Sequence, residues 1–296
     1  MSNTIRRDIL TAVPVSFTAE GEVDFGGSRE ILEFVRDSGV DGAFVLGTTG
    51  EFASLSREER DGLTRLSLAV LSDLPVVVHV GAPSLFEVRN LIADAVRSGA
   101  TTIAVLTPYY LPASEAAVMR FYEAVAEASS GLRVFVYLFE ARTGIRVSPD
   151  MLGRIAQLPN IVGAKLSGES LESVSAYRAA VPESFELFTG ADRDLASAAD
   201  HGAQGVVSGI ASVFPRPFLD LVAALESGDR SRIEKTQSAV NDVVDTVIGD
   251  PARMKAGLRL QGVNAGFSRM ALDEPDEDIA AELARAVRTY AGAPAA

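Results

Sequence analysis

The sequence predicts an α/β protein, a (β/α)8 TIM barrel followed by a C-terminal helical extension. The chain has 296 residues, a length that α/β barrels commonly fill as one domain. Over roughly the first 210 residues, eight short apolar runs rich in β-branched residues alternate with amphipathic segments, as in a barrel of parallel strands. No convincing strand follows residue 215. These observations together indicate the barrel and its extension.

Each of the eight apolar runs is short enough for one buried strand. A doubly wound sheet is the structural alternative, but it normally has fewer strands, and no G-x-G-x-x-G motif follows the first run. The expected strands are Ile9–Phe17, Gly42–Leu46, Val76–Val80, Thr102–Leu106, Val134–Phe139, Ile161–Leu166, Leu187–Thr189 and Gly205–Ser208.

Helix-start signals separate the strands, namely two capping boxes and a serine followed by proline. They are Ser56 with Glu59, Ser84 with Glu87, and Ser148 before Pro149. The last part of the chain carries helical patterns at Pro217–Ser227, Ser231–Val247, Met254–Leu260 and Glu277–Tyr290. We therefore expect a catalytic barrel over residues 1–213 and a helical extension over residues 214–296.

Composition and charge exclude several classes of function. A formal net charge of −13 argues against nucleic acid as a partner, because phosphate binding needs a basic face. Without cysteine there is no thiolate nucleophile or cysteine zinc site, and the two histidines are too far apart for a helical metal pair. The sequence has no apolar stretch long enough to span a membrane and no N-terminal apolar run of a signal peptide. We expect a cytoplasmic protein without a membrane partner.

In a barrel of this kind the active site lies at the carboxyl ends of the strands. That rule selects a short set of segments with polar or glycine residues just after the expected strands. They are Gly47–Glu51, Thr107–Tyr110, Tyr137 with Glu140–Gly144, Lys165, Thr189–Asp192 and Ser208–Gly209.

Lys165 is the sharpest of these candidates because it ends an apolar run. A poorly solvated ammonium there would be present partly as free amine, which can attack a carbonyl. The alternative is a lysine that reaches solvent or pairs with an acid. The other two lysines, Lys235 and Lys255, lie in amphipathic helical patterns, where we expect solvent-exposed faces.

Three further features could serve the same chemistry. Tyr137 lies on the strand before Lys165, and a phenol beside an amine can move protons; the alternative is a core tyrosine. The Gly47–Gly50 segment offers backbone N–H groups and two hydroxyls that suit a carboxylate, or its glycines simply make the turn. Arg142 could bind a second carboxylate or lie on the surface.

These pieces, in this order, resemble the dihydrodipicolinate synthase / N-acetylneuraminate lyase family of class I aldolases. The resemblance covers about Asp8 to Val213, and the helical tail more loosely. Residues Gly42–Phe52, with Glu59 downstream, fit the first signature of that family. The family fold is a (β/α)8 barrel with a C-terminal helical extension, usually assembled as a homotetramer, a dimer of dimers.

The resemblance implies that Lys165 forms a Schiff base with pyruvate or another 2-oxo acid. Tyr137 would be the acid/base, and Thr48 would connect its hydroxyl to Tyr110, which this family lends across a dimer interface. Thr48 and Thr49 would hold the pyruvate carboxylate, and Arg142 the carboxylate of an aldehyde substrate. No metal or organic cofactor is implied, because the protonated imine is the electron sink. Besides these catalytic candidates, we expect Thr49, Gly50, Arg142, Glu140 and Val207 to bind substrate.

The chain departs from the family pattern at three places. Tyr-Asn-x-Pro becomes Tyr137 followed by Leu138, Phe139 and Glu140; an acidic residue after the lysine becomes Leu166; and Thr-Pro near the N-terminus becomes Val15-Ser16. We expect these changes to alter the wall that faces the second substrate. Glu140 adds a carboxylate that could neutralise Arg142 or bind a hydroxyl or amine.

Three hypotheses of function follow from this resemblance. The first is a pyruvate-dependent Schiff-base synthase or lyase resembling dihydrodipicolinate synthase. The second is an aldolase or dehydratase of the same family acting on a 2-oxo-3-deoxy sugar acid. The third, from another class, is a non-catalytic 2-oxo acid binding protein, which the joint presence of Lys165, Tyr137, Thr48 and Tyr110 disfavours. Missing ligands and a missing nucleotide loop disfavour a metal-dependent aldolase and a dehydrogenase.

Overall fold

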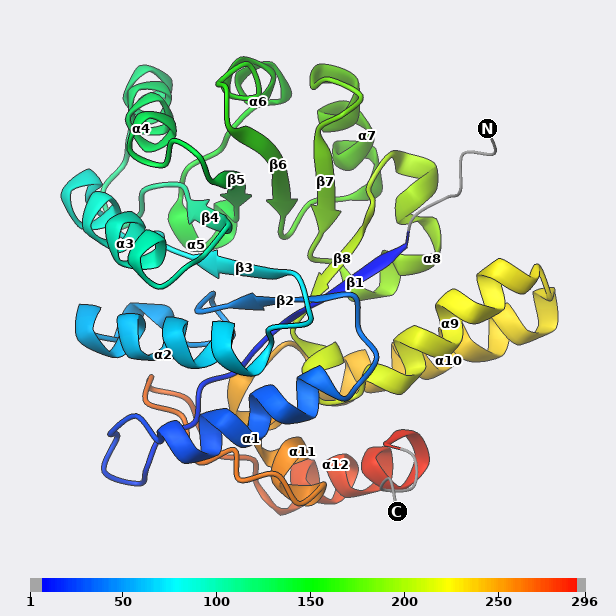
Figure 1. Ribbon diagram of the computed structural model, residues 1–296. Helices are drawn as coiled ribbons and strands as arrows, with labels where there is room; N and C mark the ends of the chain where they lie inside the picture. The colour runs from blue at the N-terminus through cyan, green and yellow to red at the C-terminus, as the bar shows by residue number, and fades with distance from the viewer. Residues whose placement is uncertain (1–6, 292–296) are drawn as a thin grey trace. The chain divides into compact units, whose positions relative to one another are not determined.

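A computed structural model describes residues 7–291 of the chain (Figure 1). Residues 1–6, part of the segment considered for a signal peptide, and residues 292–296 lie outside the description. Eight strands form a closed barrel in chain order, which confirms the predicted fold class. The strands are β1 (Asp8–Ala12), β2 (Gly42–Val45), β3 (Val76–His79), β4 (Thr102–Leu106), β5 (Arg133–Leu138), β6 (Ile161–Leu166), β7 (Glu186–Thr189) and β8 (Gly205–Ser208).

The first strand is shorter than the expected Ile9–Phe17. The amide of Val13 still donates to the Phe44 carbonyl, but Pro14 has no N–H and so cannot continue the ladder. Phe17 instead forms isolated antiparallel bridges with Val23 and Phe267. A proline in the apolar run was therefore a strand-end signal.

The helices fall between the strands and after the last one, as expected. They are α1 (Phe25–Arg36), α2 (Arg57–Val70), α3 (Leu85–Arg97), α4 (Glu115–Ala128), α5 (Glu140–Thr143), α6 (Pro149–Ile155), α7 (Leu171–Ala180), α8 (Leu195–Ala198), α9 (Pro215–Ser227), α10 (Arg230–Val247), α11 (Pro251–Leu260) and α12 (Glu277–Tyr290). None of the helices within residues 7–291 is long and apolar enough to cross a membrane.

The predicted helix starts are capped, but of the two predicted capping boxes the one at Ser84 and Glu87 is present only as the serine cap. Ser56 and Glu59 form a reciprocal capping box at the start of α2. The Ser84 hydroxyl accepts from the amide of Glu87 at the start of α3, and Ser148 caps α6 with Pro149 in its first turn.

The chain comprises two compact units, which are described separately. The first contains Val76–Val207, with β3 to β7 in parallel register and helices that pack side by side, α3 with α4, α4 with α6, and α6 with α7 (Figure 1). Its core is formed by apolar side chains of the strands, such as Val105, Val136 and Leu187, which are fully buried.

The second unit contains Asp8–Pro75 and the described chain from Ser208 onward. In it, β1 pairs with β2, α1 packs on α2, and α9 and α10 run side by side as a long hairpin (Figure 1). Helix α12 contacts both α10 and α11. The domain boundary at residue 213 expected above stays a prediction.

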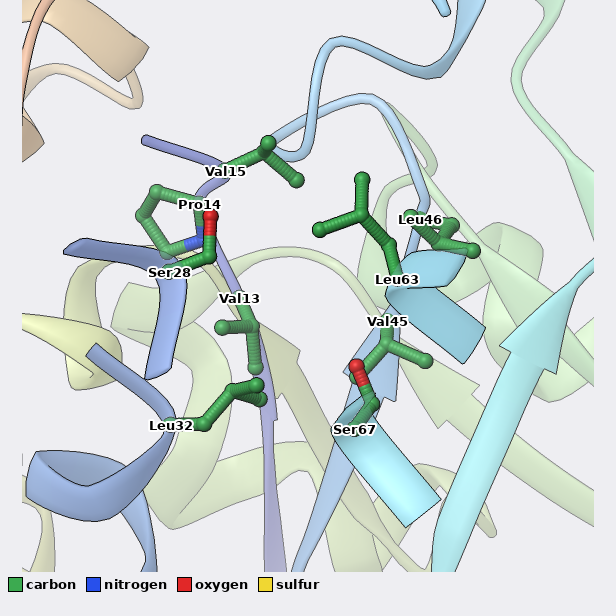
Figure 2. A pocket seen from close by; sticks show the side chains of 9 residues that line it. All are labelled: Val13, Pro14, Val15, Ser28, Leu32, Val45, Leu46, Leu63 and Ser67. Atoms are coloured by element: carbon green, nitrogen blue, oxygen red, sulfur yellow. The ribbon is translucent and has the colours of Figure 1, made fainter. Parts of the chain in front are cut away.

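A small cavity lies within the second unit, between α1, α2 and the segments at the ends of β1 and β2 (Figure 2). Its volume is about 10 Å³, which is room for one water at most. Apolar side chains and two serines, Ser28 and Ser67, line it. A cavity of this size holds no substrate, so the candidate site is sought at the strand ends.

Candidate active site

Lys165 and Tyr137 are register partners on β6 and β5. The Nζ atom of Lys165 lies 4.5 Å from the centroid of the Tyr137 ring, within the range of a cation–π contact. Lys165 is 6% exposed and Tyr137 is 1% exposed. The structure therefore brings together the predicted amine and phenol, with the amine almost excluded from water.

The rings of Phe135 and Phe188 lie close to the strand segment that carries Lys165. Gly163, two positions earlier on β6, shares a face with Lys165 because side chains alternate along a strand. A Cβ at Gly163 would lie 2.4 Å from the Phe135 ring. The missing side chain lets Phe135 of β5 approach Phe188 of β7 across β6, with ring centroids 6.1 Å apart. Phe188 is also the register partner of Lys165, so aromatic residues of β5 and β7 lie on both sides of this part of β6.

His79, at the end of β3, also contacts Tyr137. The two rings meet edge to face with centroids 5.9 Å apart, and His79 is fully buried. Since β4 separates β3 from β5, rings on these strands can meet only on the concave face of the sheet. Sequence reasoning weighed His79 only as a metal ligand and missed this contact. Applying the strand-end rule to the third strand would have found it.

Phe139 connects Tyr137 to Arg142. The Phe139 and Tyr137 rings are stacked with centroids 6.3 Å apart, and the Arg142 guanidinium lies 5.8 Å from the Phe139 ring centroid. Arg142 and Glu140 are both exposed on the short helix α5. Of the two alternatives for Arg142, the structure shows the surface position, and the Phe139 ring lies between its guanidinium and the Tyr137 ring.

The expectation that Leu138 alters the wall facing the second substrate is wrong. Leu138 is the register partner of Leu166, and both side chains are buried. Because neighbouring strand residues point to opposite faces, this leucine pair lies on the face opposite to Tyr137 and Lys165. Two of the departures from the family pattern therefore form one apolar contact behind the site.

Tyr110 and Val207 have contrasting environments. Tyr110 follows β4, is 91% exposed and has left-handed backbone with φ of 79°. Such backbone is uncommon for a residue other than glycine and costs about 1 to 3 kcal/mol. Val207 lies in β8 and is buried. Tyr110 is thus largely exposed to solvent within this chain, whereas Tyr137 is buried.

In the second unit, the Gly47–Glu51 loop follows β2. The amide of Gly50 donates to the Gly47 carbonyl at 3.1 Å, and that of Glu51 to the Thr48 carbonyl at 3.0 Å. The Gly50 N–H, which lies in the segment expected to offer amides to a carboxylate, is therefore used within the turn, as is the N–H of Glu51. Left-handed backbone occurs on both sides of the two threonines, at Leu46 and Glu51. Such strain is typical of functional loops.

The expected solvent exposure of Lys255 is wrong, whereas that of Lys235 is confirmed. The Lys255 side chain in α11 is fully buried, and its Nζ lies 2.5 Å from Oε1 of Glu51. Sequence periodicity treats a lysine as a solvent-facing residue, and the partner lies 204 positions away. No local pattern could have revealed the pair.

Comparisons with known proteins identify the family of this chain. A family model described as the dihydrodipicolinate synthetase family matches residues 6–290. A 4-hydroxy-tetrahydrodipicolinate synthase of Syntrophus aciditrophicus is 30% identical over 273 residues, covering 91% of this chain and 94% of that protein.

Solved structures are similar as well. Dihydrodipicolinate synthase DapA-2 from Bacillus anthracis matches with a TM-score of 0.90 at 25% identity, covering 96% of this chain and 98% of that one. A prophage protein of the dihydrodipicolinic acid synthase family from E. coli K12, in complex with pyruvate, matches with a TM-score of 0.88 at 27% identity, covering 96% and 98%. The barrel, the match over nearly the whole chain and the 30% identical relative show that this chain belongs to the dihydrodipicolinate synthetase family and is a lyase.

Proposed function

We propose that the chain is a 4-hydroxy-tetrahydrodipicolinate synthase that condenses pyruvate with an aldehyde through a Schiff base on Lys165. The observation that carries the proposal is the register pair of Lys165 and Tyr137, a nearly buried primary amine against a phenol ring. The names of the relatives and the pyruvate complex of the E. coli K12 protein support the choice of substrate.

The environments of the three lysines support Lys165 as the nucleophile. Lys255 is buried and held by Glu51, so a substrate carbonyl cannot reach its amine. Lys235 is exposed on α10, a helix of the C-terminal extension rather than a strand end. Lys165 alone combines low exposure with a position at the carboxyl end of a barrel strand.

The residues have distinct proposed roles in imine formation. The Lys165 amine attacks the carbonyl carbon of pyruvate, and loss of one water gives the imine. Tyr137 transfers the protons that this step and the later condensation require. Removal of a methyl proton from the protonated imine gives an enamine, whose carbon attacks the aldehyde, and water then releases the product from Lys165.

The remaining site assignments are part of the proposal. Thr48, Thr49 and Gly50 are assigned to the pyruvate carboxylate, and Arg142, with Glu140 beside it, to the carboxylate of the aldehyde. Val207 is assigned to the substrate-binding wall. A homotetramer in which Tyr110 reaches a partner subunit fits the high exposure of this side chain. The cytoplasmic location stays a prediction.

Borohydride reduction in the presence of pyruvate tests the imine. Intact mass and peptide mapping should show one pyruvyl adduct per chain, on Lys165. The adduct should be absent in Lys165→Ala and unchanged in the matched control Lys235→Ala. An adduct on another lysine, or none, would refute the mechanism.

A second assay separates the members of the family. We expect turnover with pyruvate and aspartate semialdehyde but not with 2-oxo-3-deoxygluconate. Activity with 2-oxo-3-deoxygluconate alone would favour the sugar-acid aldolase or dehydratase. Trapping without turnover of either compound would favour the binding protein.

A further inference from the structure

A buried charge network connects α11 to the Gly47–Glu51 loop within the second unit. The Nζ atom of Lys255 donates to Oε1 of Glu51 at 2.5 Å and to the Phe267 carbonyl at 2.7 Å. It also lies 4.7 Å from the centroid of the Phe17 ring. Both charged side chains are excluded from water, with exposures of 0% and 1%.

The other oxygen of Glu51 holds the segment that follows α11. Oε2 accepts hydrogen bonds from the amides of Arg269 at 2.9 Å and Met270 at 2.7 Å. The Arg269 guanidinium in turn donates to Glu59 and to the Ser54 carbonyl. Within residues 7–291, the hydrogen-bond partners of the Glu51 carboxylate therefore all come from the C-terminal part of the chain.

The backbone of Glu51 links this network to the two threonines. Glu51 has a left-handed backbone conformation with φ of 52°, and its amide donates to the Thr48 carbonyl. Gly209 lies next to both elements. A Cβ at Gly209 would lie 3.0 Å from Oγ1 of Thr49 and 2.7 Å from the Met254 side chain of α11, so a side chain from the loop and one from the helix both pack against Gly209.

Stability alone is a poor explanation for the ion pair. Removing two charges from water costs much of what their attraction gains, and an apolar pair is often as stable. Burial lowers the pKa of the Lys255 ammonium, against the opposing effect of Glu51. The position of the pair, beside the loop proposed to hold a carboxylate, indicates a role in binding.

We propose that Lys255 is a positioning residue for the 2-oxo acid: it fixes the left-handed conformation of Glu51 and neutralises the Glu51 carboxylate. This inference rests on the proposed function, because it concerns the loop assigned to the pyruvate carboxylate. Without the ammonium, the buried negative charge repels an incoming carboxylate and releases the loop. Lys255 itself touches neither substrate.

Lys255→Met tests the proposal, because it removes the charge but keeps most of the stem. The concentration of pyruvate that gives half-maximal imine trapping should rise by about tenfold or more. The aldehyde KM and kcat at saturating pyruvate should change by less than about threefold. The exposed Lys235→Met is the matched control and should behave as the wild type.

The double variant Glu51→Gln with Lys255→Met separates charge from shape. Removing the unpaired carboxylate should recover about threefold or more of the lost pyruvate affinity. The proposal is overturned if folded Lys255→Met reaches half-maximal imine trapping at the same pyruvate concentration as the wild type. Equal weakening of pyruvate and aldehyde binding also overturns it.

A buried pair that loses one partner can unfold a protein, so near-UV circular dichroism is recorded for each variant. If Lys255→Met does not fold, Lys255→Arg is the test variant, because it keeps the positive charge but changes the shape of the side chain. Its pyruvate concentration for half-maximal imine trapping should rise by about threefold or more. An unchanged concentration overturns the inference. Failure of the wild type to trap pyruvate on Lys165 would instead refute the proposed function.

Discussion

Leu138 and Leu166 lie side by side in the register of β5 and β6, one position after Tyr137 and Lys165. They stand where the family pattern has asparagine and an acidic residue. Since both are buried, the chain has replaced a polar combination by an apolar one on the face behind the site. The two departures are therefore one structural change, and it lies on the face opposite to Tyr137 and Lys165.

Leu138→Asn should destabilise the protein by about 2 to 4 kcal/mol, because it removes apolar burial and leaves an amide without partners. Urea unfolding measures the effect, with Leu260→Asn as an exposed control. The double variant with Leu166→Asp should lose less than the sum of the two single variants. A Leu138→Asn protein as stable as the wild type would contradict the apolar contact.

Gly163→Ala should disturb the packing of the Phe135 ring near Lys165. The new Cβ would lie 2.4 Å from the Phe135 ring and 2.5 Å from the Glu186 carbonyl oxygen, so the ring and the backbone must move. We expect a loss of about 1 to 3 kcal/mol in stability and slower borohydride trapping of pyruvate. Gly26→Ala, at an exposed helix start, is the control; equal thermal midpoints for the two variants would argue against the close approach.

Phe139→Ala should weaken the use of the aldehyde more than that of pyruvate. The change removes the ring that lies between Tyr137 and the Arg142 guanidinium, and Arg142 loses its aromatic support. We expect the aldehyde KM to rise by about tenfold while the pyruvate KM changes little. Steady-state kinetics with both substrates measure this, and Phe86→Ala, a highly exposed phenylalanine of α3, is the control. Equal rises in both KM values would contradict the role of Phe139.

Glu59 should contribute to stability in a pH-dependent way. Its hydrogen bonds from Arg269 hold the pKa of the carboxyl below its ordinary value of 4.5. Because the native state favours the ionised form, this contribution is present above about pH 4.5 and is lost as pH falls through the lowered pKa.

Thermal midpoints of the wild type and Glu59→Gln between pH 7 and pH 3 test this prediction. The difference between them should be largest near neutrality and shrink in acid. The exposed Glu58→Gln is the matched control. A difference that grows on acidification would contradict the sign of the effect.

The fold was predictable because the apolar runs and helix caps are local signals. Thr102–Leu106 and Ile161–Leu166 were predicted with the bounds that the structure has. The overlong first strand was wrong, because Pro14 ends the ladder and the residues beyond it turn to pair elsewhere.

The site was predictable only in part. The strand-end rule and the resemblance found Lys165 and Tyr137, whose contact the structure confirms. His79 was missed because the strand-end rule was not applied to the third strand. Phe139 was expected only as part of an altered wall, because no local pattern predicts its contacts with the Tyr137 ring and the Arg142 guanidinium. Lys255 was wrongly placed in water, since its partner is remote in the chain. Hydrophobic periodicity cannot reveal an ion pair between residues that lie far apart in the sequence.

The dependence of Glu51 on the segment from Lys255 to Met270 bears on how far the chain can be shortened. A truncated protein ending near Val213 would keep all eight strands and Lys165. It would also keep the Glu51 carboxylate but lack the Lys255 ammonium and the Arg269 and Met270 amides that bind it. Such a minimal barrel would carry an orphaned charge next to two threonines. The helical extension therefore holds the loop in place, and truncated or fused versions of the protein have to include it.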